Sequence, residues 1–429
     1  MNAALHTEGA LQLCSAAIEV APVPPERLLA MAGDPAAAFI TPGGDAWVGL
    51  GAARWIGPAQ ESGHDDAAPL WAGLLDDSPD APAPAALGAL PFRADESPDV
   101  LWQGLMPGGL VLPERLYVQQ GGRAWWRLTV PVSDVGALQH RLARERQALA
   151  ALAHGEARPL PAWHALGEGG APAHYVQSVA QAVQRIRRGE IDKVVLARRG
   201  AVAFDHAPSP AALLARLGMH HPDCVRYAWR RGGKTWLGAT PETLVRVDGH
   251  QLRTHALAGT RTAELADELL ASAKDRHEHA IVVDAIRRAL APLTHTLPPP
   301  STPVVRRLHG LAHLHTAIEA TLRADVDFLR LVHALHPTPA VCGVPAARAA
   351  ALLAALEPEP RGLYAGPFLR LSPGGDGLAV VSLRGAVIDG GIAVLPAGAG
   401  IVEGSDGEAE LAETRVKQRS VLDAFQAGI

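Results

Sequence analysis

The spacing of apolar residues along the chain predicts helices in several places. Residues three, four and seven positions apart share one face of a helix. Tyr175 to Arg188 carries its apolar residues at this spacing, and so does the segment that follows Lys274 as far as Leu290. Apolar spacing, or charge and alanine content, predicts further helices at residues 135–153, 325–335, 345–356 and 407–427.

Between these helices lie runs of β-branched residues bounded by turn residues, a pattern typical of strands. Asp192 to Arg199 is one such run, and Gly377 to Ile388 predicts an uninterrupted strand that contains Arg384. Asp248 and Gly249 predict a hairpin turn. Further strands are predicted at residues 46–50, 124–131, 225–230, 235–239, 243–247, 251–256, 304–309, 313–321 and 392–396, followed by a glycine-rich turn at 397–400.

The helix predicted after Lys274 places a carboxylate on its apolar face. Glu278 shares this face with Ile281 and Val282. Burying an unpaired carboxylate costs several kcal/mol or shifts its pKa, so the chain must supply a partner, a cation or water. One interpretation is therefore a ligand site. The other is an ion pair at the wet end of the helix, with Arg276 or Lys274 as the partner.

A second acidic pair lies on the helix predicted at 407–427, where Glu410 and Glu413 share a face with apolar residues. Together with Asp275 and Glu278 they form an all-oxygen set suited to Mg²⁺, a hard ion that binds few carboxylates and keeps several waters. The structural alternative is that both pairs form salt bridges with arginines. Sequence alone does not place the two helices side by side.

Other candidate groups are an amine, a carboxyl group and a glycine run. Alternate side chains share a face of a strand, which groups Lys193 with Val195. This lysine either extends into water or is a buried amine. Glu242 follows a predicted turn and is ordinary on its own. The glycines at 397–400 lack the spacing of a phosphate loop, but they would let backbone N–H groups approach a ligand carboxylate.

Composition narrows the class of protein. The chain has 429 residues, 48% of them hydrophobic, and a net charge of -5 without a long basic block, so neither nucleic acid nor an anionic membrane is an expected partner. Uninterrupted apolar runs of about 18 residues are missing from the sequence. The cysteines Cys14, Cys224 and Cys342 are far apart, and the first residues carry no positive leader. We therefore expect a cytoplasmic protein.

A set of motifs in a fixed order decides between these interpretations. The motifs are Lys193 to Arg198, Gly238 to Glu242, Ala258 to Arg261, Lys274 to His279, Arg361 to Gly366 and Ala397 to Val402. With these motifs the chain resembles the chorismate-utilising enzymes, the family of isochorismate synthases, salicylate synthases, anthranilate synthase component I and aminodeoxychorismate synthases. The resemblance is strong over about residues 175–425 and weak over about residues 1–160.

The resemblance implies an α/β fold of the α+β type, in which antiparallel sheets flanked by helices form a single large domain over residues 1–429. Both halves of the chain contribute to it. Two positions depart from the family pattern: Leu411 replaces an aromatic residue, and Gly407 replaces a proline. These changes predict looser packing behind Glu410 and Glu413.

Within the family, Leu335 to Ala340 and Gly88 to Phe92 resemble the isochorismate synthase branch, whereas amine-transferring relatives usually carry threonine at the position of Ala340. The implied reaction is Mg²⁺-dependent addition of water at C2 of chorismate with loss of the C4 hydroxyl. A salicylate synthase, which then eliminates pyruvate, is the alternative, and amine transfer is less favoured. An inactive chorismate-binding protein is a further alternative. The pathway could lead to a siderophore or to menaquinone, and the protein could be a monomer or a homodimer.

The resemblance also implies roles for individual residues. Lys193 would be the base that activates water, and Glu242 the acid that protonates the leaving hydroxyl. An amine base and a carboxylic acid donor need different surroundings. Glu278 and Glu413 would bind Mg²⁺ directly, and Asp275 and Glu410 through waters. The substrate-binding residues would be Thr260, His313, Ala340, Tyr364, Arg384, Gly398 and Lys417, with Tyr364 and Arg384 at the enolpyruvyl carboxylate.

Overall fold

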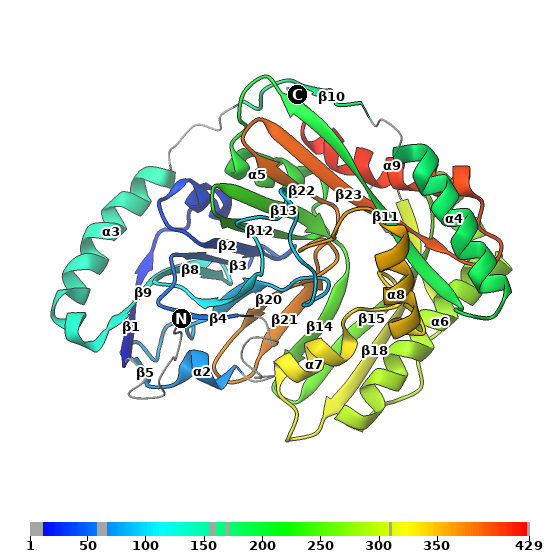
Figure 1. Cartoon of the computed structure of the whole chain (residues 1–429). Coiled ribbons are helices and arrows are strands. Elements are labelled where there is room, and N and C mark those ends of the chain that lie inside the picture. Colours follow the sequence, from blue (N-terminus) through cyan, green and yellow to red (C-terminus); the bar gives the residue numbers. More distant parts are fainter. Residues whose placement is uncertain (1–11, 58–66, 154–158, 168–170, 309–310, 427–429) are drawn as a thin grey trace, which may run out of the picture.

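Two large sheets, flanked by helices, make up the protein (Figure 1). The computed structural model describes residues 12–57, 67–153, 159–167, 171–308 and 311–426. Within these ranges one sheet has 13 strands and the other has 10. Their neighbouring strands are antiparallel, apart from β1 and β5, which are parallel. The predicted fold class, an α/β fold with antiparallel sheets and flanking helices, is confirmed.

The larger sheet draws strands from both ends of the chain. Its order is β10 (Trp163–Ala165), β11 (Lys193–Phe204), β23 (Ile392–Ile401), β22 (Gly385–Asp389), β13 (Lys234–Thr240), β12 (Val225–Arg231), β2 (Ala36–Ile40), β3 (Ala46–Leu50), β8 (Arg115–Gln120), β9 (Arg123–Pro131), β1 (Leu13–Val20) and β5 (Leu74–Asp76). The short β19 (Gly343–Val344) pairs with the start of β11.

The smaller sheet is built in the same way. Its order is β16 (Thr294–Thr296), β18 (Leu311–Leu322), β15 (Gln251–Thr262), β14 (Thr243–Asp248), β21 (Gly377–Val381), β20 (Pro367–Leu371), β6 (Ala86–Ala89), β7 (Gly109–Leu112) and β4 (Arg54–Ile56), with β17 (Val304–Leu308) paired to β18. Since both sheets contain strands from before residue 160 and after residue 175, the weakly matching N-terminal part is built into the same fold.

Helices cover the sheets, and side-chain caps fix where several of them begin. They are α2 (Ala68–Trp71), α3 (Leu138–Ala153), α4 (Ala171–Arg187), α5 (Pro210–His220), α6 (Ala273–Leu290), α7 (Phe328–Leu335), α8 (Ala346–Leu356) and α9 (Gly407–Ala424). The Ser272 side chain accepts a hydrogen bond from the backbone N–H of Asp275 and so caps α6. Asp406 caps α9 in the same way. The α5 helix was not among the predicted elements.

The main hydrophobic core lies between the two sheets. Phe368 of the smaller sheet packs against Phe39 and Tyr227 of the larger sheet, with ring centroids 6.0 and 5.4 Å apart. A second core lies where α3, α5 and α9 pack on the other face of the larger sheet. In the part of the chain that the structure describes, no helix has both the length and the apolar character that a membrane span requires.

The uninterrupted strand predicted at Gly377 to Ile388 is wrong. The chain instead forms β21 in the smaller sheet, turns at Leu383 and Arg384, and enters the larger sheet as β22. Arg384 has a φ of 51°, a left-handed conformation that is uncommon for a side chain of this size. The flanking runs are apolar on both faces, so their pattern does not reveal the change of sheet.

The packing between the sheets predicts that Phe368→Ala will lower the free energy of unfolding by about 3–5 kcal/mol, because the cavity left behind cannot collapse between two sheets. Leu75→Ala is the control, since Leu75 is 55% exposed and its loss should have little effect. Urea denaturation followed by circular dichroism measures both. A change below about 1 kcal/mol for Phe368→Ala would contradict the described inter-sheet core.

Candidate active site

One cavity of about 120 Å³ brings together elements from both sheets and two helices. Its walls come from β11 and β23 of the larger sheet, β15 and β18 of the smaller sheet, and the helices α6 and α9. The residues singled out in the sequence that line it are Lys193, Glu242, Asp275, Glu278, His313, Ala340, Tyr364, Arg384, Gly398, Glu410, Glu413 and Lys417. The side chain of Thr260 lies outside the described residues, although its backbone pairs with His313.

Two of these residues lie at points where the chain passes between the sheets. Glu242 connects β13 of the larger sheet to β14 of the smaller one, and Arg384 connects β21 to β22. The two crossings are hydrogen-bonded to each other, because Val381 N–H donates to the Glu242 carbonyl and Ala239 N–H donates to the Arg384 carbonyl. The backbone hydrogen bonds therefore fix the separation of the two segments from which the Glu242 and Arg384 side chains extend.

A buried ion pair joins Lys193 and Glu278. The Lys193 side chain is 1% exposed, and its Nζ lies 2.7 Å from Glu278 Oε1. Burial raises the pKa of Glu278, but the charge and hydrogen bond of Lys193 outweigh it, so the pKa lies below its ordinary value. The alternative in which Lys193 extends into water is wrong. The interpretation in which Arg276 or Lys274 pairs with Glu278 is also wrong. It considered only neighbours on the same helix, whereas the partner comes from strand β11.

The glycines near residue 400 make room for this pair. Residues 397–400 belong to β23 rather than to the predicted turn. A Cβ on Gly400 would lie 2.7 Å from Glu278 Oε1 and 3.1 Å from Lys193 Cε. On Gly398 it would lie 3.1 Å from the Leu196 carbonyl and 3.3 Å from the Tyr364 hydroxyl. Only glycine leaves both side chains undisturbed at the wall of the cavity.

The other acids of α6 and α9 that line the cavity each face a cation. Glu413 lies 2.7 Å from Lys417, which also donates to the Gly398 carbonyl at 2.8 Å. Glu410 lies 3.4 Å from Lys274, and Asp275 lies 2.9 Å from Arg261. Salt bridges therefore form, as the structural alternative required, but three of the four acids pair with lysine rather than with arginine.

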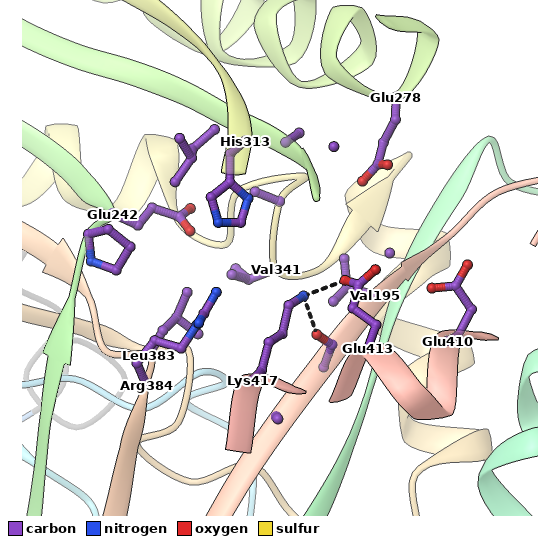
Figure 2. Close-up of a pocket in the computed structure, with 18 of the residues that line it drawn as sticks. Val195, Glu242, Glu278, His313, Val341, Leu383, Arg384, Glu410, Glu413 and Lys417 are labelled. Carbon is purple, nitrogen blue, oxygen red and sulfur yellow. Dashed lines mark hydrogen bonds and ion pairs between the residues drawn. The ribbon is translucent and has the colours of Figure 1, made fainter. Parts of the chain in front are cut away.

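The oxygen donors of α6 and α9 face the same end of the cavity, which bears on whether they could hold a cation. Figure 2 shows Glu278, Glu410 and Glu413 on one side of the cavity. Burial raises the pKa of Glu410, and the negative charges of Glu413 and Glu278 raise it further. A cation would relieve this repulsion. Within the described ranges no three His, Cys, Asp or Glu side chains are grouped closely enough to form a metal site.

The opposite side of the cavity carries the groups suited to an anionic ligand (Figure 2). Burial raises the pKa of Glu242 to about 7, although the charges of Lys193, Lys417 and Arg384 oppose this shift. Burial also lowers the pKa of His313 well below its ordinary value, and the positive charges of Arg384 and Lys417 add to the effect. A neutral imidazole and a carboxyl group that is half protonated near pH 7 thus share the cavity with a guanidinium.

Burial acts on Tyr364 too, raising its pKa to about 12, so its phenol stays protonated. The guanidinium of Arg384 is within 3.3 Å of the Ser420 hydroxyl of α9. A phenol and a guanidinium are both hydrogen-bond donors, and they suit a carboxylate of a ligand. Ala340 lies in the same wall as Val341.

Sequence reasoning missed residues that support the site. His279 is 1% exposed, and its Nε2 lies 2.7 Å from the hydroxyl of Thr316. The buried stripe of α6 runs through Asp275, His279 and Val282, slightly rotated from the predicted face. Counting four residues on from Asp275 would have found His279. The ion pair of Glu357 and Arg361 was also missed, although Arg361 opens one of the motifs.

The looser packing expected behind Glu410 and Glu413 is not seen. Leu411 is only 3% exposed and belongs to the main core. A Cβ on Gly407 would lie 2.8 Å from Val176 Cγ1, so the glycine allows α4 to approach the start of α9 closely. Both positions that depart from the family pattern, Leu411 and Gly407, are therefore closely packed in this protein.

Comparison with known proteins gives a consistent result. A family model described as chorismate binding enzyme matches residues 2–426. The salicylate biosynthesis isochorismate synthase of Pseudomonas aeruginosa is 37% identical over 365 residues, which are 80% of this chain and 75% of that one. The menaquinone-specific isochorismate synthase of Escherichia coli superposes with a TM-score of 0.77 at 29% identity, covering 96% and 95% of the two chains. Anthranilate synthase component I of Streptococcus pneumoniae, at 23% identity and a TM-score of 0.66 over 79% and 81%, shares the fold.

The raised pKa of Glu242 predicts how stability depends on pH. The pKa of Glu242 is higher in the folded than in the unfolded protein. Its contribution to stability is therefore complete below the unfolded pKa and is lost as the pH rises through about 7. The glutamine in Glu242→Gln does not titrate. The free energy of unfolding of this variant, relative to that of the wild type, should therefore rise by on the order of 2 kcal/mol between about pH 5 and pH 8.5. The control is Glu319→Gln, which changes a side chain that is 72% exposed. Urea denaturation across this pH range measures the difference, and parallel curves for wild type and Glu242→Gln would contradict the raised pKa.

Proposed function

Because this chain belongs to the chorismate-binding enzymes, we propose that it is an isochorismate synthase, which converts chorismate to isochorismate. The observation that carries the proposal is that one cavity contains a buried amine, Lys193, and a carboxyl group with a pKa of about 7, Glu242. These are the two groups that a reaction needing one base and one acid requires. The relatives named above that are isochorismate synthases support the choice within the family.

The proposed reaction adds water at C2 of the ring and removes the hydroxyl at C4. Lys193 would act as the base and take a proton from the attacking water while the new C2–O bond forms. The two conjugated ring double bonds each shift by one position, and the C4–O bond breaks. Glu242 would give its proton to the leaving hydroxyl, which departs as water. A carboxyl group with a pKa near 7 is protonated often enough to serve as this donor at neutral pH.

The anionic groups of chorismate would be held by donors on the Glu242 side of the cavity. We propose that Arg384 and Tyr364 bind the enolpyruvyl carboxylate, because a guanidinium and a protonated phenol offer several donors to a planar anion. The left-handed backbone at Arg384 and the hydrogen bonds between the two sheet crossings support fixed placement of these groups. His313, Lys417, Thr260, Ala340 and the Gly398 backbone would complete the substrate pocket.

We propose Mg²⁺ as the cofactor, with Glu278 and Glu413 binding it directly and Asp275 and Glu410 binding it through waters. The ion would orient the ring carboxylate and stabilise negative charge that develops during the reaction. Support comes from the chemistry of the donors, which are all carboxylate oxygens at one end of the cavity. The raised pKa of Glu410 adds to this, because it reflects crowding of negative charge.

The cellular setting is a further part of the proposal. Cys14, Cys224 and Cys342 are all free and buried, which suits a reducing compartment such as the cytoplasm. Isochorismate would feed siderophore or menaquinone biosynthesis. The enzyme would act as a monomer or a homodimer.

The function is tested by NMR of the products formed from chorismate and Mg²⁺ without ammonium or an added lyase. An equilibrium mixture of chorismate and isochorismate is expected, and excess EDTA should abolish its formation. Release of salicylate and pyruvate would reassign the protein to the salicylate synthases. Unchanged chorismate would contradict the proposal and lead to tests of ammonium as the nucleophile and of chorismate binding without turnover.

The roles of the two proton-transferring groups predict the behaviour of Lys193→Ala and Glu242→Gln. Each variant should lose more than about 10³-fold in kcat while remaining folded, because each lacks a group that transfers a proton. In the wild type, kcat should fall as the pH rises through about 7, where Glu242 loses its proton. Steady-state assays and circular dichroism measure these effects, with Glu319→Gln as the control. Near-normal turnover in either variant would refute the role assigned to that residue.

A further inference from the structure

A second buried ion pair, formed by Glu357 and Arg361, lies next to the cavity without lining it. The Arg361 residue is 4% exposed. Its Nε donates to Glu357 Oε2 at 2.8 Å, and its Nη2 donates to Oε1 at 2.5 Å. This is the forked geometry in which a planar guanidinium meets a carboxylate. The pair lies between the end of α8 and the turn that leads to Tyr364.

The pair takes the place of a missing strand beside β11. Partner strand β19 pairs with β11 only at Lys193 and Val194, and one more bond joins Val195 N–H to the Cys342 carbonyl. Beyond this point Arg361 Nη2 donates to the Val195 carbonyl at 2.5 Å, and Ala197 N–H donates to Glu357 Oε1 at 2.8 Å. Two side chains thus satisfy the backbone groups that a longer β19 would have bonded.

The same guanidinium contacts two other walls of the cavity. Its Nη1 donates to the Val341 carbonyl at 2.7 Å, and Val341 lies next to Ala340. Val195 and Val341 both line the cavity (Figure 2). The guanidinium also lies 5.9 Å from the ring centroid of Tyr364. Arg361 therefore contacts the strand that carries Lys193, the segment at Ala340 and the proposed substrate ligand Tyr364.

We propose that Arg361 and Glu357 are positioning residues, which hold Lys193, the Ala340–Val341 segment and Tyr364 at a fixed separation for the reaction. This inference rests on the proposed function. The physical basis is that a misplacement of about 1 Å can lower a rate by about 10²-fold. Arg361 bonds Glu357 and two carbonyls through three separate nitrogens of its planar fork, a geometry that the single nitrogen of lysine cannot reproduce.

The test compares Arg361→Lys with a matched variant, Arg127→Lys. Arg127 is also buried, at 1% exposure, and pairs with Asp76 at 2.6 Å in the sheet region far from the cavity walls. Both variants keep the positive charge, so neither leaves a buried carboxylate without a cation. Both should lower the melting temperature by a few degrees. Only Arg361→Lys should lower kcat, by about 10- to 100-fold, with KM changing by less than threefold.

Wild-type kcat in Arg361→Lys, or an equal loss of kcat in Arg127→Lys, would overturn the proposal. Amide hydrogen exchange of residues 193–199 provides a second readout that needs no substrate. Exchange there should be faster in Arg361→Lys and unchanged in Arg127→Lys, and unchanged exchange in both would also overturn the proposal. If wild-type protein left chorismate unchanged, the proposed function would fail, whereas the exchange measurement would still decide whether Arg361 orders this strand.

Discussion

The buried ion pair of Lys193 and Glu278 is the interaction on which the rest of the site depends. A charge that is buried in the protein interior requires a partner of opposite charge. Removal of either Lys193 or Glu278 would leave the other charge uncompensated. The pair can form only because Gly400 has no side chain to occupy the space between them. It also requires β11 and β23 to pair in the observed register, which places Val195 opposite Gly400. One ion pair thus constrains a helix, two strands and a glycine.

The cavity keeps two carboxyl groups in different states without separating them into different pockets. Glu278 is close enough to Lys193 for the positive charge to outweigh burial, and its pKa is lowered. In the part of the chain that the structure describes, no cation lies at hydrogen-bonding distance from the Glu242 carboxyl group, so burial prevails and its pKa rises to about 7. The difference arises from placement, because Glu242 lies on a sheet crossing whereas Glu278 lies on a helix. Perturbed pKa values of buried groups in one cavity are a common mark of a functional site.

Sequence motifs were sufficient to predict the fold class, and both that prediction and the family resemblance are confirmed. They also named twelve residues that line one cavity, although the roles of these residues stay predictions. The sequence did not reveal which residues far apart along the chain come into contact. The partner of Glu278 was sought among helical neighbours, since only local spacing is visible in a sequence, and the true partner comes from β11. The crossing at Arg384 was missed because strands that are buried on both faces show no alternation that would reveal a change of sheet.

The pairing of β11 with β23 has a consequence for how the protein is made. Val195 pairs with Gly400, which is roughly 200 residues further along the chain. A ribosome adds about 5–20 residues per second, so at least about ten seconds pass between the synthesis of β11 and that of its neighbour β23. Until then the apolar edge of β11 has no β23 to cover it. The cavity is thus among the last parts of the molecule to be completed, and during synthesis this edge is open to chaperones or to pairing with another nascent chain.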